Sequence, residues 1–196
     1  GEFLANPSRQ LTFSIAPPST FGFFDSSTSA SIKIQGNSLL LKNRPAKEND
    51  TFYAPNGKID VTSNSDLRIE DKTLYAPNGE ITLRTTGKLQ LLQSSWRKVE
   101  QLKINVPNKD GKDELISVSI GNINVSGDNG GQIFIRAGQF ILDRSIILAD
   151  TYKDNKGLGG INITVDGTMR LTNGAQITAD NLGSGQGGRI TITANA

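Results

Sequence analysis

Apolar and polar residues alternate in short runs along most of the chain. Ile133 and Ile135 lie on either side of Phe134, and Ile190 and Ile192 lie on either side of Thr191. A spacing of two residues is typical of a strand with one buried face, whereas an amphipathic helix needs apolar residues three or four positions apart. The pattern therefore predicts a chain built from short strands, without helical segments.

The segment 130–194 contains three copies of one unit. The first and last copies share Gly-Gly-x-Ile-x-Ile-x-Ala at 130–137 and 187–194, a shift of 57 residues. A middle copy aligns with the first at a shift of 30, so the unit recurs every 27 to 30 residues. The pairs that this shift of 30 brings together are Ile133 with Ile163, Ile135 with Val165, Ile141 with Leu171, Ile147 with Ile177, Ala149 with Ala179 and Asp150 with Asp180.

A shorter repeat precedes it. The sequence Tyr-Ala-Pro-Asn-Gly occurs at 53–57 and again at 75–79, and an alternating apolar pair follows each copy. Proline fixes its own φ, and Asn and Gly tolerate a positive φ, so each copy predicts a tight turn that leads into a strand.

One unit of this size is too short to close a hydrophobic core on itself, but stacked units bury their apolar residues against one another. Copies that stack in register form parallel strands about 4.8 Å apart. We therefore predict an all-β protein, a parallel β-helix with coils of about 22–30 residues. The glycine pairs are expected at tight corners, and Thr82, Asn162, Thr164 and Thr191 on the exposed outer face.

The regular pattern defines the expected domain organisation. Residues 1–30 are interpreted as a tag remnant, because Gly1-Glu2-Phe3 resembles a cloning scar, followed by an N-terminal lead-in or cap. Residues 31–196 are expected to form the β-helix, truncated at its C-terminal end, with exposed ends that could associate end to end. The alternation fails at about 93–118, which predicts an irregular insertion, either a longer coil with a surface hairpin or a short helix.

Composition excludes several kinds of chemistry. The 196 residues include 21 Lys and Arg, 19 Asp and Glu, no Cys and no His. Disulfides, thiol nucleophiles and cysteine zinc sites are therefore absent, as is the imidazole that most acid–base catalysis near neutral pH uses. A net charge of +2 does not suggest nucleic acid as a partner. No run approaches the roughly 18 apolar residues of a membrane helix. We expect no cofactor and no membrane insertion.

Several motifs follow one another in a recognisable order. They are Phe21-Gly22-Phe23-Phe24, Ile32-Lys33-Ile34-Gln35-Gly36, Ala-Pro-Asn-Gly-x-Ile, Gly-Gly-x-Ile-x-Ile, Leu-Thr-Asn-Gly-Ala-Gln-Ile-Thr-Ala and Gly-Ser-Gly-Gln-Gly-Gly. Over residues 15–196 this order resembles the large exoproteins of the filamentous-haemagglutinin type, most closely cyanobacterial ones with a haemagglutination activity domain. The Asn-Pro-Asn motifs of that family's secretion region do not occur here.

The resemblance implies a right-handed β-helix and two-partner secretion through an outer-membrane transporter. It also implies a secreted or cell-surface location and adhesion to a glycan or protein receptor. Our leading hypothesis is therefore a non-enzymatic structural and adhesive segment. Segments where the repeat breaks, at 42–51, 93–115 and 150–158, are the expected places for recognition.

The alternative hypothesis is a β-helix that binds or cleaves polysaccharides. Stacked coils would hold the carboxylates of Asp150 and Asp180 about 5 Å apart, a separation used by retaining glycosidases. Asp143 is a further candidate acid, and Trp96, with Arg97 beside it, a candidate sugar platform. Each repeat aspartate could equally cap a turn at a strand exit.

A cation site is a further possibility for the loop that begins at Asp150. Asp150, Asp154 and Asn155 could together offer oxygen ligands to a hard cation. A solvated loop is the other interpretation of the same residues.

Overall fold

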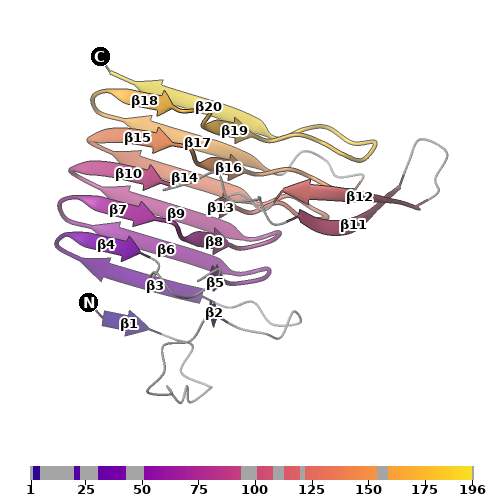
Figure 1. The fold of residues 1–196 in the computed structure, drawn as a ribbon, viewed down its shortest axis with the longest axis horizontal. Helices are drawn as coiled ribbons and strands as arrows, with labels where there is room; N and C mark the ends of the chain where they lie inside the picture. Colours follow the sequence, from indigo (N-terminus) through magenta and orange to yellow (C-terminus); the bar gives the residue numbers. More distant parts are fainter. Residues whose placement is uncertain are drawn as a thin grey trace.

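Strands account for most of the computed structural model, and none of the described residues is helical. The structure describes residues 2–4, 20–22, 31–42, 51–93, 101–107, 113–119, 122–153 and 159–195. For 2–4, 20–22, 101–107 and 113–119 it describes the backbone only. The strands form stacked rungs (Figure 1), which confirms the prediction of an all-β parallel β-helix.

The first of the three stacked sheets has seven strands, and all its pairings are parallel except that of its N-terminal edge strand, β1. Its strands, in spatial order, are β1 (Glu2–Leu4), β3 (Ser31–Gly36), β6 (Lys58–Ser63), β9 (Glu80–Thr85), β14 (Gln132–Ala137), β17 (Gly160–Val165) and β20 (Arg189–Ala194). This strand includes Glu2 and Phe3 of the apparent cloning scar, and it covers one edge of the sheet in the antiparallel direction.

The second sheet has five parallel strands and the third has six. The second contains β18 (Met169–Thr172), β15 (Gln139–Asp143), β10 (Lys88–Leu92), β7 (Leu67–Glu70) and β4 (Leu39–Lys42). The third contains β19 (Gln176–Thr178), β16 (Ile146–Leu148), β13 (Ile123–Asn124), β8 (Thr73–Tyr75), β5 (Thr51–Tyr53) and β2 (Thr20–Gly22). Since β2 pairs in parallel with β5, the stack already includes a strand from the segment expected to be a lead-in.

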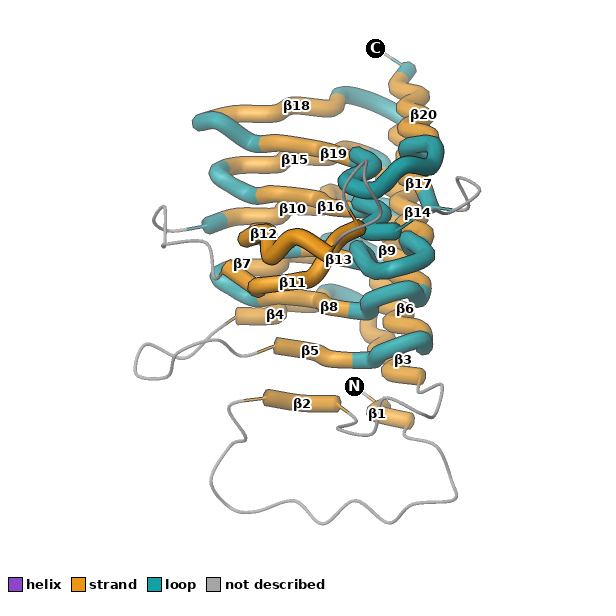
Figure 2. The backbone as a smooth tube through the Cα atoms, turned by 90° about the vertical axis from the view of Figure 1, so that its right-hand side faces the viewer, coloured by secondary structure: helices purple, strands orange, loops and turns teal. Residues whose placement is uncertain are grey.

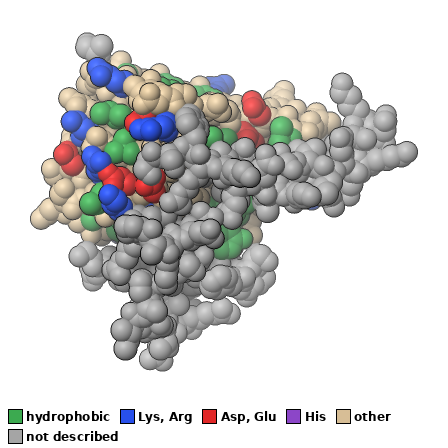
Figure 3. Space-filling view, in the orientation of Figure 1, with side chains coloured by type: hydrophobic (Ala, Val, Ile, Leu, Met, Phe, Trp, Pro, Cys, Tyr) green, Lys and Arg blue, Asp and Glu red, His purple; other side chains and the backbone are tan. Residues whose placement is uncertain are grey.

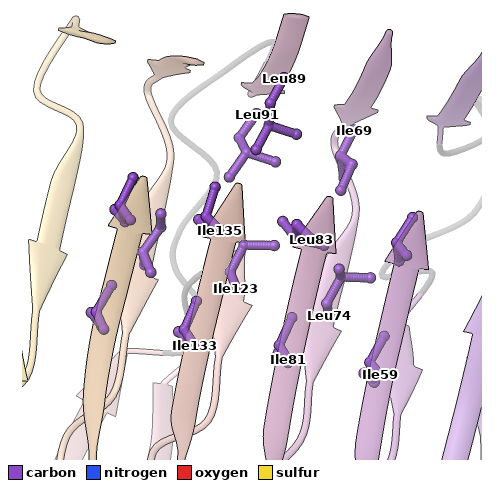
Figure 4. Packing of buried hydrophobic residues seen from close by; sticks show 14 of the residues in the cluster. Ile59, Ile69, Leu74, Ile81, Leu83, Leu89, Leu91, Ile123, Ile133 and Ile135 are labelled. Atoms are coloured by element: carbon purple, nitrogen blue, oxygen red, sulfur yellow. The ribbon is translucent and has the colours of Figure 1, made fainter. Parts of the chain in front are cut away.

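The core is a set of aliphatic columns that run along the stack. In the first sheet Ile59, Ile81 and Ile133 occupy equivalent places on neighbouring strands and point the same way into the interior (Figure 4). All three side chains are fully buried. Burying a side chain of this size contributes roughly 1.5–3 kcal/mol. The alternation seen in the sequence therefore corresponds to inward residues whose stacking holds the coils together.

The register corrects the expected alignment of the last repeats. Ile133 pairs with Ile161 and Ile135 with Ile163, a step of 28 residues, so the expected pairings of Ile133 with Ile163 and Ile135 with Val165 are wrong. The next step pairs Ile161 with Ile190, and the overall shift of 57 is therefore confirmed.

The step is not constant within one coil. In the second sheet Leu171 pairs with Leu142, a step of 29, and the expected pairing of Leu171 with Ile141 is wrong. In the third sheet Ile147 pairs with Ile177, the predicted step of 30. A single shift fails because successive coils have corners of different length, and corners tolerate added residues better than the stacked strands do.

Corners are tight where the sequence predicted them. A Cβ built on Gly131 would lie 2.4 Å from the carbonyl oxygen of Gly79 and 2.6 Å from the Cβ of Val125, so only glycine fits between these coils. The two Pro-Asn-Gly turns place Asn56 and Asn78 at positive φ, 51° and 56°. These turns follow the predicted mechanism, in which Asn adopts a left-handed conformation at low cost.

The irregular segment contains an antiparallel hairpin formed by β11 (Gln101–Pro107) and β12 (Asp113–Ser119). The hairpin extends beyond the rungs on one side of the stack in Figure 1 and lies in front of them in Figure 2. Of the two interpretations of the insertion, the surface hairpin is the one observed among the described residues, while residues 94–100, 108–112 and 120–121 lie outside them.

Candidate functional site

Asp150 and Asp180 stack on one another, as the repeat predicted. The residues that follow them, Thr151 and Asn181, pair in parallel, and the backbone N–H of Thr151 donates to the carbonyl oxygen of Asp180 at 2.8 Å. Both aspartates leave the third sheet at the same corner of successive coils.

The carboxylate of Asp150 forms hydrogen bonds with residues at and before this corner in the next coil. Its Oδ1 accepts from the backbone N–H of Asp180 and from Oγ1 of Thr178, each at 2.9 Å. The backbone N–H of Asp150 donates in turn to Oγ of Ser126 at 2.9 Å. One residue thus connects three successive coils, which is the turn-capping role that was the alternative to catalysis.

The electrostatics of Asp150 follow from this position. Burial raises the pKa of its carboxyl above the usual 3.8, and the charge of Asp180 raises it further. The hydrogen bonds from Asp180 and Thr178 act in the opposite direction, but burial dominates. Because Oδ1 already accepts two hydrogen bonds, any chemistry at this site would fall to the other carboxylate oxygen.

Tyrosines line the same corner. The rings of Tyr53 and Tyr75 lie 5.4 Å apart between centroids, and Tyr152 is only 5% exposed. Burial, with the neighbouring Tyr53, raises the pKa of Tyr75 to about 12. The pKa of Tyr152 is also raised, chiefly by burial and then by Tyr75. The phenols of Tyr75 and Tyr152 are therefore neutral near pH 7 and serve as packing and hydrogen-bonding groups.

A cavity of about 340 Å³ lies at the corner where the chain leaves the second sheet, and we call it the corner cavity. The residues that line it are Lys42, Arg68, Glu70, Asp71, Leu92, Gln93, Asp143 and Arg144. Acidic and basic side chains gather on one face of the molecule in Figure 3. The candidate acid Asp143 therefore has both basic and acidic neighbours.

The acids of the corner cavity are paired. Glu70 accepts from Nζ of Lys42 at 2.8 Å and bonds to Arg68, and these two hydrogen bonds lower its pKa. Asp143 accepts from Nδ2 of Asn173 at 2.6 Å, and this bond, with Arg144 at 3.5 Å, lowers its pKa. Both carboxylates are held ionised by partners, which suits an ion-pair network rather than a proton donor.

Three of the predicted ligand-contact residues, Trp96, Arg97 and Asp154, lie outside the described residues. The recognition segments are partly outside as well, at 43–50, 94–100, 108–112 and 154–158. In the described part of the chain no group of three His, Cys, Asp or Glu side chains could hold a metal ion. Nor does any described segment form a helix long and apolar enough to cross a membrane.

Two features of the surface were not predicted from the sequence. Thr82 points outward yet is only 2% exposed, so its expected exposure is wrong. Phe134, its partner on the next strand, faces outward as well and is 37% exposed. The alternation of Ile133, Phe134 and Ile135 indicates that Phe134 faces outward. An aromatic residue between two isoleucines is, however, equally typical of a fully buried strand.

Comparisons with protein-family models, with curated proteins and with solved structures each found no match. The resemblance to exoproteins of the filamentous-haemagglutinin type accordingly stays a prediction.

Proposed function

We propose that this chain is a non-enzymatic structural and adhesive segment of a large exoprotein. The observation that supports the proposal is the continuity of the stack, in which inward columns stay in register from β3 to β20. Each coil adds a rise of about 4.8 Å, so a chain of such coils extends away from its attachment point while presenting its outer faces.

The state of the candidate acids argues against catalysis. Asp150 caps a corner, and Asp143 is paired with Asn173 and Arg144. A glycosidase of the retaining type needs one carboxylic acid and one carboxylate on either side of an accessible sugar. The structure supports a different use of these residues, namely the connection of one coil to the next.

The resemblance supplies the proposed partners and location. In this proposal an outer-membrane transporter exports the full protein by two-partner secretion, and the β-helix acts outside the cell against a glycan or protein receptor. A transporter gene beside the gene for this chain would support that route. Retention of the full protein inside cells that carry such a transporter would contradict it.

Adhesion can be measured with beads that carry the folded chain. We expect these beads to bind surfaces coated with cell-surface glycans or proteins more strongly than beads that carry Ile133→Asp, a variant designed to break the stack. Equal binding by both kinds of bead would contradict an adhesive role.

Cleavage is tested separately by incubating the chain with acidic and neutral polysaccharides and measuring reducing ends. We expect no turnover. Turnover that disappears in both Asp150→Asn and Asp180→Asn would replace our proposal with the polysaccharide-cleaving alternative.

A further inference from the structure

A groove runs over the outer face of the first sheet, across β14, β17 and β20. It has a volume of about 300 Å³. The residues that line it with outward positions are Gln132, Phe134, Gly160, Asn162, Arg189 and Thr191. They form two columns along the stack, because Gln132, Gly160 and Arg189 are paired in register, and so are Phe134, Asn162 and Thr191.

Glycine creates the depth of this groove. Gly160 places no side chain between those of Gln132 and Arg189, so the backbone of β17 forms the floor. A Cβ at this position would lie 2.7 Å from the carbonyl oxygen of Arg189, which means that the coils pack closely here. The floor of the groove is therefore set by the backbone register, and exposed side chains such as Gln132, Phe134 and Arg189 form its walls.

Phe134 gives the groove an apolar wall. It is the only aromatic residue among the outward positions of β14, β17 and β20. Part of the ring has a structural use, since Thr82 beside it is buried, but 37% of the residue is exposed. An exposed aromatic ring on a rigid sheet can pack against the C–H groups on one face of a sugar ring.

The charge of the outer face changes along the stack. On β6 and β9 the acids Asp60 and Glu80 are matched by bases, with Lys58 at 2.6 Å from Glu80 and Arg84 at 3.6 Å from Asp60. The three strands under the groove contain no acidic residue at all. They carry Arg136 and Arg189, so this part of the face is positive.

We propose that this groove binds an acidic polysaccharide. A sugar ring packs on Phe134, the side chains of Asn162 and Thr191 hydrogen-bond to its hydroxyl groups, and Arg189 pairs with a carboxylate or sulfate. The inference rests on the proposed adhesive function and deepens it, because it names the surface and the class of receptor.

The experiment is calorimetric titration of the whole chain with three probes. Oligogalacturonate offers carboxylates, a heparin oligosaccharide offers sulfates, and dextran oligosaccharides of the same length are neutral. We expect at least one acidic probe to bind and dextran not to bind. Affinity should fall when salt is raised, because an ion pair at an open groove is screened.

Variants locate the site. We expect Phe134→Ala and Arg189→Ala each to weaken binding about tenfold, the effect of losing one charged hydrogen bond or one stacked ring. Phe134→Trp should keep the affinity, because it keeps an aromatic face. Circular dichroism and thermal unfolding of each variant establish that the stack is intact.

Matched controls come from the outer face of the second sheet. Leu40, which is 60% exposed, and Arg170, also exposed, belong to the same outward column there. Leu40→Ala and Arg170→Ala remove a similar apolar side chain and a similar charge away from the groove. Both should bind the acidic probes with the affinity of the unaltered chain.

Two results would overturn the inference. One is folded Phe134→Ala and Arg189→Ala variants that bind as tightly as the unaltered chain, and the other is dextran that binds as tightly as the acidic probes. If beads adhere to receptor surfaces but no acidic probe binds, the groove inference fails and the adhesive function stands. If the groove variants lose acidic probes but beads never adhere, the groove stands and the adhesive function fails.

Discussion

At the scale of single residues, polar side chains at the corners accept hydrogen bonds from backbone N–H groups of neighbouring coils. Oδ1 of Asp66 accepts from the backbone N–H of Lys88 at 2.8 Å, and Oδ1 of Asn78 accepts from that of Asn129 at 2.8 Å. Asp150 makes the same kind of bond with Asp180. A corner cannot continue the strand ladder, so these oxygens satisfy N–H groups that would otherwise have no protein partner.

The raised pKa of Asp150 makes a prediction about pH. A carboxyl whose folded pKa lies above its unfolded value stabilises the fold below the unfolded value, and this stability is lost as pH rises through the folded pKa. Asp150→Asn keeps an oxygen for Asp180 and Thr178 and removes the buried charge. We expect this variant to be up to about 1 kcal/mol more stable at neutral pH.

Urea unfolding at pH 7 and at about pH 3 measures the effect, because Asp150 is protonated in both folded and unfolded chains at the lower pH. The advantage of Asp150→Asn should disappear there. Asp180→Asn, at an exposed equivalent position, serves as the control and should change stability by no more than about 0.5 kcal/mol. A large loss of stability in Asp150→Asn at pH 7 would contradict this account.

The lowered pKa of Glu70 predicts the opposite dependence of stability on pH. Its pKa is lowered by hydrogen bonds from Lys42 and Arg68. The ionised form therefore stabilises the fold above the unfolded value, and this stability is lost as pH falls through the folded pKa. The Glu70→Gln variant should have a free energy of unfolding up to about 1 kcal/mol lower at pH 7. The expected loss is small because Lys42 and Arg68 are about half exposed.

A double-mutant cycle with Lys42→Met isolates the ion pair, and thermal unfolding at pH 7 and pH 3 follows it. We expect a coupling energy at pH 7 that shrinks to near zero at pH 3. A coupling of the same size at both values of pH would mean that packing, not charge, joins these side chains.

At the scale of elements, alternation predicts the inward columns but not every register. Where one isoleucine lies between polar residues, as in β17, its inward direction follows from the sequence. In β15 three apolar residues are adjacent, and the sequence does not tell whether Ile141 or its neighbours point inward. The structure buries Phe140 and Leu142, and Ile141 faces outward. Corner lengths set that choice, and a single shift between repeats cannot represent them.

The candidate sites, too, could be predicted from the sequence only in part. Stacking of Asp150 on Asp180 was predictable because it follows from the repeat. The hydrogen bonds of Asp150 to Thr178 and Ser126 were not, because they depend on how close the corners of successive coils lie. The groove at Gly160 joins residues from three copies of the unit, and it becomes visible only when the steps of 28 and 29 residues are known.

One column of the first sheet contains isoleucines at different depths in the stack, so the contribution of stacking to stability can be compared between identical side chains. Ile133 lies between Ile81 and Ile161 and is fully buried, while Ile190, two coils further along, is 41% exposed. Ile133→Ala should cost about 2–4 kcal/mol, since it leaves a cavity between two coils. Ile190→Ala should cost less than about 1.5 kcal/mol, because its site is open on one side. Equal costs in urea unfolding would contradict the column as the source of stability.

At the scale of the whole molecule, the two edges of the first sheet differ. At one edge the antiparallel strand β1 covers β3. At the other, β20 pairs with β17 on one side and has no described strand on its other side. The inward side chains of this last rung include Ile190 and Ile192, exposed at 41% and 47%, and Leu171 nearby at 45%. An edge with unpaired backbone groups and an apolar end favours pairing with another chain.

We therefore expect concentration-dependent association of this polypeptide through β20, the end-to-end pairing that repeat stacking predicts. Two copies of β20 related by a two-fold axis would pair antiparallel, as β1 already does with β3 at the opposite edge.

Ile192→Lys should reduce the association, because it places a charge in the apolar end of the stack. Thr193→Lys adds the same charge to the same strand at an outward position and is the matched control. Sedimentation velocity over a range of concentrations measures both variants. If Thr193→Lys and Ile192→Lys dissociate equally, charge alone accounts for the effect and the exposed end of the core is not the contact. If the unaltered chain sediments as a monomer at every concentration, the open edge does not pair at all.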